Sequence, residues 1–258
     1  MKLEFRFISV VTFCFIVVFS AKLSAREFLN TFMQVNIGYS NSIGVGGDLV
    51  DAERSNNLAG KRLKYDDSSI NFMMDLVPFR PIILGDESAA IKIGFRGGYR
   101  MHYLEQRFTA NDGNGKQEYK GDLMKYNTVV FGPVIRYAPQ ISLFGSLDDS
   151  YSAESGLTLF ALYGHVLNGN IDAFAANRAY GESFPGITHS SMSGYKIDIG
   201  IGGETSICSV NLGLNLYYSY MRMKFGDAIY ENVGRKSSLH SFCLEIYFGM
   251  PLENRLPF

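Results

Sequence analysis

The chain has 258 residues, with 24 lysines and arginines against 25 aspartates and glutamates, for a net charge of −1. Its mean hydropathy is +0.01, so polar and apolar residues are nearly balanced. This balance argues against nucleic acid as a partner, because domains that bind nucleic acid are usually markedly basic. Beyond the N-terminal region, no run of about eighteen apolar residues occurs, which excludes transmembrane helices from the rest of the chain.

Residues 1–25 are predicted to be a secretory signal peptide. Lys2 and Arg6 precede the apolar run "FISVVTFCFIVVFSA", and the small residues of "KLSA" follow it. We expect cleavage after Ala25, with Ala21 as the alternative site. A membrane anchor is the competing interpretation, but the run falls short of the roughly twenty residues that a helical span requires.

Residues 26–258 contain segments in which apolar and polar residues alternate. Successive side chains of a β-strand point to opposite faces, so each such segment predicts a strand between two different environments. Most of them approach or exceed the about 9–11 residues of a transmembrane strand, whereas strands of globular proteins usually have about 5–6. The eight predicted strands are 31–40, 68–77, 89–103, 122–137, 156–167, 194–204, 210–221 and 241–248.

Three of these segments have particular features. In "AAIKIGFRGGYRMHY" (89–103), isoleucine, phenylalanine, tyrosine and methionine alternate with glycine and cationic residues. The segment 122–137 contains Pro133, which a strand ladder tolerates only at an edge or a bulge. The segment 156–167 is apolar on both faces.

The connections between the predicted strands alternate in length. Polar loops of about 41–67, 104–121, 168–193 and 223–238 follow the odd-numbered strands, and shorter links lie near 78–88, 138–155 and 205–209. Outer-membrane barrels have an even strand number, with long loops outside and short turns in the periplasm. Eight strands close a barrel just wide enough for its own side chains.

The predicted fold class is therefore all-β, an eight-stranded antiparallel up-and-down transmembrane β-barrel. In lipid every backbone amide must be paired, and closure of a barrel achieves this. A soluble, lipocalin-like barrel is the alternative, in which Ile93, Ile199 and Leu214 would form the core. In the membrane barrel these side chains face lipid, and a girdle of aromatic residues is expected at the interfaces: Tyr39, Phe79, Tyr103, Tyr126, Tyr137, Tyr163, Tyr195, Tyr220 and Phe248.

Two cysteines, Cys208 and Cys243, follow the predicted signal peptide. A hairpin of the last two strands centred near residue 230 would place Cys243 opposite position 217. The two sulfurs would then lie about 25–30 Å apart along the strands. No disulfide spans such a distance, so we expect two free thiols.

This pattern resembles the small eight-stranded outer-membrane barrels of the OmpA transmembrane domain, OmpX and OmpW type. The resemblance covers the whole of 26–258 as strand lengths and alternation. It implies the cell outer membrane as location, membrane lipid as surroundings and the barrel-assembly machinery, which reads a C-terminal aromatic residue, as partner. The chain ends in Phe258, but Pro251, Asn254 and Pro257 depart from the alternation. The cleaner signal ends at Phe248 and leaves a short C-terminal tail.

The inward faces of the predicted strands collect charged residues of both signs. Buried charges are tolerated when they are paired, so nearly equal numbers favour a cross-linked plug over an open pore. Chain direction places Asp75 near Lys92 at the periplasmic end, with Glu245 in the same half. The predicted lumen charge network is Asp75, Lys92, Arg96, Arg100, Arg136, Lys196, Asp198, Glu204 and Glu245.

The sequence offers little for catalysis or metal binding. A serine nucleophile needs a histidine base within hydrogen-bond reach, and the adjacent His189, Ser190 and Ser191 form no triad by themselves. The loop "NDGNGKQE" (111–118) lacks the spacing of a phosphate or calcium loop. We predict no enzyme, no metal site and no cofactor.

The predicted function is the display of four long surface loops on a plugged barrel, for adhesion or for contact with a host or a small-molecule ligand. The alternative is a narrow porin-like or OmpW-type channel for small solutes.

Overall fold

The computed structural model describes residues 32–55, 63–78, 82–84, 89–111, 115–139, 155–181, 183, 187–207, 210–229 and 234–251. These residues form one sheet with two short helices. The strands are β1 (Phe32–Gly46), β2 (Lys64–Val77), β3 (Ile82–Leu84), β4 (Ala89–Asn111), β5 (Lys116–Pro139), β6 (Ser155–Asp172), β7 (His189–Ile207), β8 (Val210–Phe225) and β9 (Lys236–Pro251), and the helices are α2 (Asp48–Ser55) and α3 (Ala175–Ala179).

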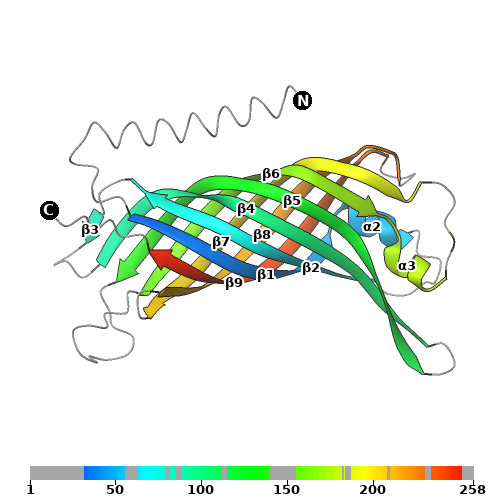
Figure 1. Cartoon of the computed structure of the whole chain (residues 1–258), viewed down its shortest axis with the longest axis horizontal. Coiled ribbons are helices and arrows are strands. Elements are labelled where there is room, and N and C mark those ends of the chain that lie inside the picture. The colour runs from blue at the N-terminus through cyan, green and yellow to red at the C-terminus, as the bar shows by residue number, and fades with distance from the viewer. Residues whose placement is uncertain are drawn as a thin grey trace.

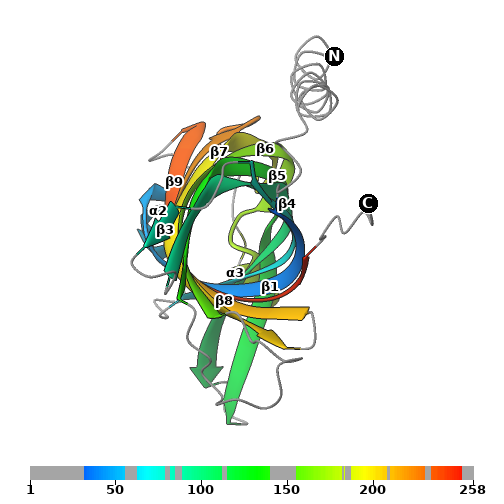
Figure 2. The same cartoon turned by 90° about the vertical axis from the view of Figure 1, so that its left-hand side faces the viewer.

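Eight of the strands close into a ring. Their order is β2-β1-β9-β8-β7-β6-β5-β4, and a direct pairing of β2 with β4 completes the circle. All of these pairings are antiparallel, including that of the first strand with the last, which begins at Gln34 opposite Pro251. Figure 2 looks along the barrel and shows this closure. The three-residue β3 pairs only with the start of β4. The predicted eight-stranded up-and-down barrel is confirmed.

The outer surface of the barrel is apolar and the inner surface is mostly polar. Along β8, every second side chain from Leu212 to Tyr218 is exposed, and the side chains between them are buried. Ile93, Ile199 and Leu214 are 41%, 60% and 43% exposed, so they do not form a core. The lipocalin-like alternative is therefore wrong. A continuous apolar belt on the outside of a closed barrel is the surface that lipid requires.

Most of the aromatic side chains predicted for the girdle face outward, but Tyr126 faces the lumen, so the prediction is wrong for that residue. Tyr39, Tyr103, Tyr137, Tyr163, Tyr195 and Phe248 are outward and exposed. Tyr126 shares the inner face of β5 with Thr128 and Val130, is only 3% exposed and stacks on His102 at 4.3 Å. Phe79 lies outside the described residues.

The two ends of the barrel differ. β1 begins and β9 ends at one of them, which we call the termini end, and α2 and α3 lie at the other, which we call the helix end (Figure 1). The strands extend further at the helix end than predicted, since β4 and β5 form a hairpin through most of the predicted loop 104–121. The loop prediction was wrong there because Leu104, Phe108 and Ala110 continue the inward face and are buried.

Pro133 interrupts one ladder of β5 without changing its register. The pairing with β6 runs from Phe131 opposite Tyr163 to Val134 opposite Phe160 and passes over Gly132 and Pro133. A Cβ atom at Gly132 would lie 1.9 Å from a backbone oxygen of β6, so the close approach of the two strands requires glycine.

Cys243 lies directly opposite Tyr217, as predicted, and is a buried free thiol. Cys208 lies outside the described residues. Within the part of the chain that the structure describes, no helix is long and apolar enough to cross a membrane.

Candidate functional site

The lumen contains an ionic cluster toward the termini end. Arg96 donates to Asp75 through both Nε (2.7 Å to Oδ1) and Nη2 (2.8 Å to Oδ2), a bidentate pair that joins adjacent strands. Arg136 Nη2 lies 2.6 Å from Glu204 Oε2 and 3.5 Å from Asp75 Oδ2. The Tyr247 hydroxyl donates to the same Glu204 oxygen at 2.9 Å. This first ionic cluster connects the five strands β2, β4, β5, β7 and β9 across the lumen.

A second ionic cluster lies further along the lumen, toward the helix end. Arg100 is ion-paired with Asp198, and its Nη2 atom also lies 3.8 Å from Glu245 Oε2. Lys196 Nζ lies 3.8 Å from Asp198 Oδ1. The Arg100 guanidinium stacks over the ring of Tyr217 at 5.1 Å. All five side chains are buried.

Ion pairs inside the barrel thus join predicted network residues of both signs, but two of the predicted placements differ from the structure. The residues in these pairs are Asp75, Arg96, Arg100, Arg136, Lys196, Asp198, Glu204 and Glu245. Asp75 lies opposite Arg96, whereas Lys92 lies opposite Arg136 on β5. The reason is that β4 begins beyond the last paired residue of β2, where β3 pairs with it instead. Glu245 contacts the second cluster rather than the first.

Apolar side chains separate the charges. A buried cluster from strands β2, β5, β6, β8 and β9 fills the lumen around the two arginines, with the Arg96 guanidinium 5.2 Å from the ring of Phe160. The apolar inner face predicted for 156–167 contributes Phe160 and Leu162 to it. The members are Met73, Val130, Val134, Phe160, Leu162, Tyr217 and Cys243.

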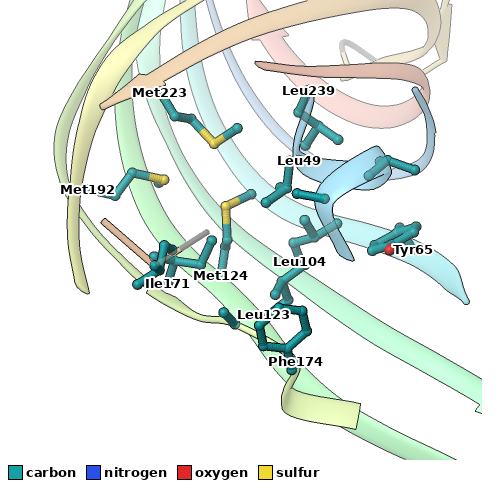
Figure 3. Close-up of a cluster of buried hydrophobic side chains, with 14 of the residues drawn as sticks. Leu49, Tyr65, Leu104, Leu123, Met124, Ile171, Phe174, Met192, Met223 and Leu239 are labelled. Carbon is teal, nitrogen blue, oxygen red and sulfur yellow. The ribbon is translucent and has the colours of Figure 1, made fainter. Parts of the chain in front are cut away.

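A larger apolar cluster, which the sequence reasoning missed, closes the helix end. Side chains from α2 and from the surrounding strands point toward one another inside the barrel mouth, together with Phe174 beside α3 (Figure 3). We call this cluster the apolar cap. Its buried members are Leu49, Val50, Ala52, Leu63, Tyr65, Leu104, Phe108, Ala110, Leu123, Met124, Tyr126, Val166, Ile171, Ala173, Phe174, Ala176, Met192, Met221, Met223, Phe225, Ile229 and Leu239.

Buried polar groups attach the two helices to the barrel wall. Gln106 of β4 donates to Glu53 Oε2 of α2 at 2.7 Å, and the backbone N–H of Phe174 donates to Glu53 Oε1 at 3.1 Å. The backbone N–H of Ala176 donates to Gln106 Oε1 at 3.1 Å. Glu53 and Gln106 are fully buried. We call this set of bonds the helix latch. Burial and the nearby Glu53 carboxylate raise the pKa of the Tyr65 phenol.

The adjacent His189, Ser190 and Ser191 lie apart from His102 and His240. His102 is inside the lumen, and His240 is bonded to the Tyr218 hydroxyl on the outer face. His189 is exposed beside Asp172, while the Ser190 hydroxyl donates to the backbone oxygen of Ser191 and accepts from a backbone N–H. No group of three metal-ligating side chains occurs among the described residues.

Comparisons with known proteins find solved structures of low similarity to this chain. No protein-family model and no curated protein matches it. Ail, the attachment invasion locus protein of Yersinia pestis, in complex with the heparin analogue sucrose octasulfate, is 15% identical over 85% of this chain and 99% of Ail, with a TM-score of 0.33. A second structure of Ail is 13% identical over 85% and 98%, with a TM-score of 0.28. The transport unit of the autotransporter AIDA-I from Escherichia coli is 8% identical over 84% and 89%, with a TM-score of 0.23. The fold assignment rests on the strand pairing and ring closure of the chain itself.

Proposed function

We propose that the chain is a protein of the bacterial outer membrane that presents a structured extracellular surface on a barrel that does not conduct solutes. The surface is the helix end, with α2, α3 and the β4–β5 hairpin, and it serves adhesion or contact with a host or small-molecule ligand. In many proteins, the binding residues lie on loops that a rigid scaffold holds in position.

The observation that carries this proposal is the filled lumen. The first ionic cluster, the second ionic cluster and the apolar cap follow one another along the barrel axis, and each spans the interior from several strands. An open pore would leave charged groups such as Arg96 and Arg100 hydrated, whereas here they are buried and paired. An OmpW-type route would have to displace the apolar cap.

The β4–β5 hairpin is the most prominent feature of the proposed surface and extends beyond the other strands (Figure 1). β4 pairs with β5 as far as Asn111 opposite Lys116. It pairs with its other neighbour, β2, only as far as Arg107, so the hairpin extends beyond β2. Tyr119 stacks on Phe108 at 5.6 Å and meets Tyr180, beside α3, edge-on at 4.9 Å. These contacts stiffen the hairpin and hold α3 against it.

The proposal includes the maturation route that the sequence predicts. Residues 1–25 would be removed during export, and the barrel-assembly machinery would insert residues 26–258 into the outer membrane, where lipid surrounds the apolar belt. The proposal assigns no enzymatic reaction, cofactor or nucleic-acid partner to the chain.

Adherence and conductance together test this function. Laboratory bacteria that express the full chain are expected to bind cultured epithelial monolayers at least several-fold more than cells with an empty vector. Deletion of residues 109–118 removes the hairpin tip and joins Phe108 directly to Tyr119, so that Arg107 and Lys120 become the last register partners. This deletion is expected to lower adherence, while Asp122→Asn at the hairpin base serves as the control.

The same protein, purified and placed in planar lipid bilayers, is expected to give no reproducible channels. If cells with the tip deletion and cells with the empty vector adhere as well as cells with the full chain, the proposed display function loses its support. Channels whose conductance changes when Arg96→Gln or Arg100→Gln is introduced would establish the channel alternative instead.

A further inference from the structure

The outward side chains of β8 indicate where each part of the strand lies along the membrane normal. Its outward side chains run from leucine through tyrosine to arginine and lysine, in the order Leu212, Leu214, Leu216, Tyr218, Tyr220, Arg222 and Lys224. Tyrosine prefers the membrane–water interface, and the leucines suit hydrocarbon. At about 3.4 Å per residue and a tilt near 45°, Lys224 stands about 14 Å above Tyr218 along the membrane normal. The two cations therefore lie at the level of lipid headgroups.

A third cation lies at the same level on the neighbouring strand. Lys224 of β8 is directly opposite Lys236 of β9, and both side chains are exposed. Arg222 lies one outward step below Lys224 on the same face. Like charges directly opposite each other on a sheet are destabilising unless a counter-charge intervenes. We call Arg222, Lys224 and Lys236 the cation rim.

Several cations on the β4–β5 side of the barrel mouth have acidic partners. Arg107 is paired with Asp66, and Lys125 Nζ lies 2.6 Å from Asp122 Oδ2. For the three members of the cation rim, no ion pair with any described residue exists. The nearest acid along the chain, Asp227, is exposed just after β8, and its backbone N–H donates to Ser190. Among the residues that the structure describes, the cation rim therefore has no acidic partner.

An apolar groove lies beneath the cation rim on the same side of the barrel. It has a volume of about 570 Å³ and runs across the outer faces of β5 to β9. Ala161 lines the groove with a shorter side chain than that of Leu159 on the same strand. The groove reaches Leu216 and Tyr218 on β8 and Phe242 on β9. These residues belong to the two strands that carry the cation rim above.

We propose that the cation rim and this groove together bind a phosphorylated lipid of the outer leaflet. The phosphate groups accept charge-assisted hydrogen bonds from the cation rim, and an acyl chain of the same molecule occupies the groove. Phosphate supplies the counter-charge that Lys224 and Lys236 need, at the depth where headgroups lie. The inference rests on the proposed outer-membrane location and adds a defined lipid to it.

Titration of the folded mature chain in detergent micelles with diphosphorylated lipid A tests the inference. The triple variant Arg222→Gln, Lys224→Gln, Lys236→Gln is expected to bind at least tenfold more weakly than the unaltered chain. The matched control, Lys116→Gln, Lys120→Gln, Lys125→Gln, removes three cations from the β4–β5 side and should bind within twofold. Ala161→Leu, which fills the groove, should weaken binding severalfold. A heat-dependent shift in electrophoresis verifies that each variant is folded.

Two further probes separate the possible partners. Dephosphorylated lipid A is expected to bind the unaltered chain as weakly as diphosphorylated lipid A binds the triple variant. Equal binding of the two lipids, or of the triple variant and the unaltered chain, would overturn the proposal. The proposal would also be overturned if the triple variant no longer bound dextran sulfate but bound lipid A as tightly as the unaltered chain. The partner of the cation rim would then be a soluble polyanion. None of these outcomes depends on adherence or conductance.

Discussion

Asp75→Leu is expected to lower the free energy of unfolding of the barrel by about 3–5 kcal/mol, the usual effect of removing one partner from a buried ion pair. Asp75 and Arg96 are 0% and 3% exposed, and Arg136 also approaches the Asp75 carboxylate. Without that carboxylate, the Arg96 guanidinium stays buried in the lumen beside the rings of Phe160 and Tyr247 and loses its bidentate partner. Urea unfolding of the protein in lipid vesicles measures the change.

Asp122→Asn is the matched control for this experiment. Asp122 pairs with Lys125 on the exposed face of the hairpin, where salt bridges contribute about 0–1 kcal/mol. The double variant Asp75→Leu, Arg96→Met should recover part of the loss, because it removes the unpaired charge together with its partner. A loss below about 1 kcal/mol for Asp75→Leu, within the range of exposed salt bridges, would mean that water reaches the first ionic cluster.

Glu53→Ala is expected to release α2 and α3 from the barrel mouth while the barrel stays folded. The change leaves the Gln106 amide and the Phe174 N–H buried without their acceptor, which costs about 1–3 kcal/mol. The population of the opened cap should rise about fivefold to about 140-fold, since 1.4 kcal/mol corresponds to a factor of ten.

Limited trypsin digestion measures this opening. Cleavage after Arg54 in α2 and Arg178 in α3 should accelerate in the Glu53→Ala protein, while the heat-dependent electrophoretic shift of the barrel is retained. Glu118→Ala, on the exposed part of the hairpin, is the control and should leave both rates unchanged. Unchanged cleavage in the Glu53→Ala protein would show that the apolar cap holds the helices without the helix latch.

The sequence predicted the features that depend on strand alternation. A period of two fixes which side chains share a face, so the outward Ile93 and Ile199 and the inward Arg96 and Arg100 followed directly. The position of Cys243 opposite residue 217 followed from one hairpin. Both depend only on the local geometry of strands.

Features that depend on register between strands, or on non-local packing, were less predictable. The pairing of Asp75 with Arg96 rather than Lys92 is set by where β4 starts relative to β2. The apolar cap was missed because its members come from segments that contain many polar residues. Leu49, Val50 and Ala52 in "DLVDAERS" were the available signal, since they lie on one side of a helix whose other side is charged.

Spin labelling at Ile199→Cys and Leu214→Cys, with Cys208 and Cys243 replaced by serine and the protein in lipid vesicles, tests the orientation of the barrel wall most directly. Labels at both positions should collide readily with dissolved oxygen and poorly with a water-soluble nickel chelate, because both side chains face acyl chains. A label at the inward Val134→Cys should be shielded from both reagents. Shielding from oxygen at Ile199 and Leu214, with lipid exposure at Val134, would contradict the orientation on which the plugged lumen, the displayed surface and the lipid site all depend.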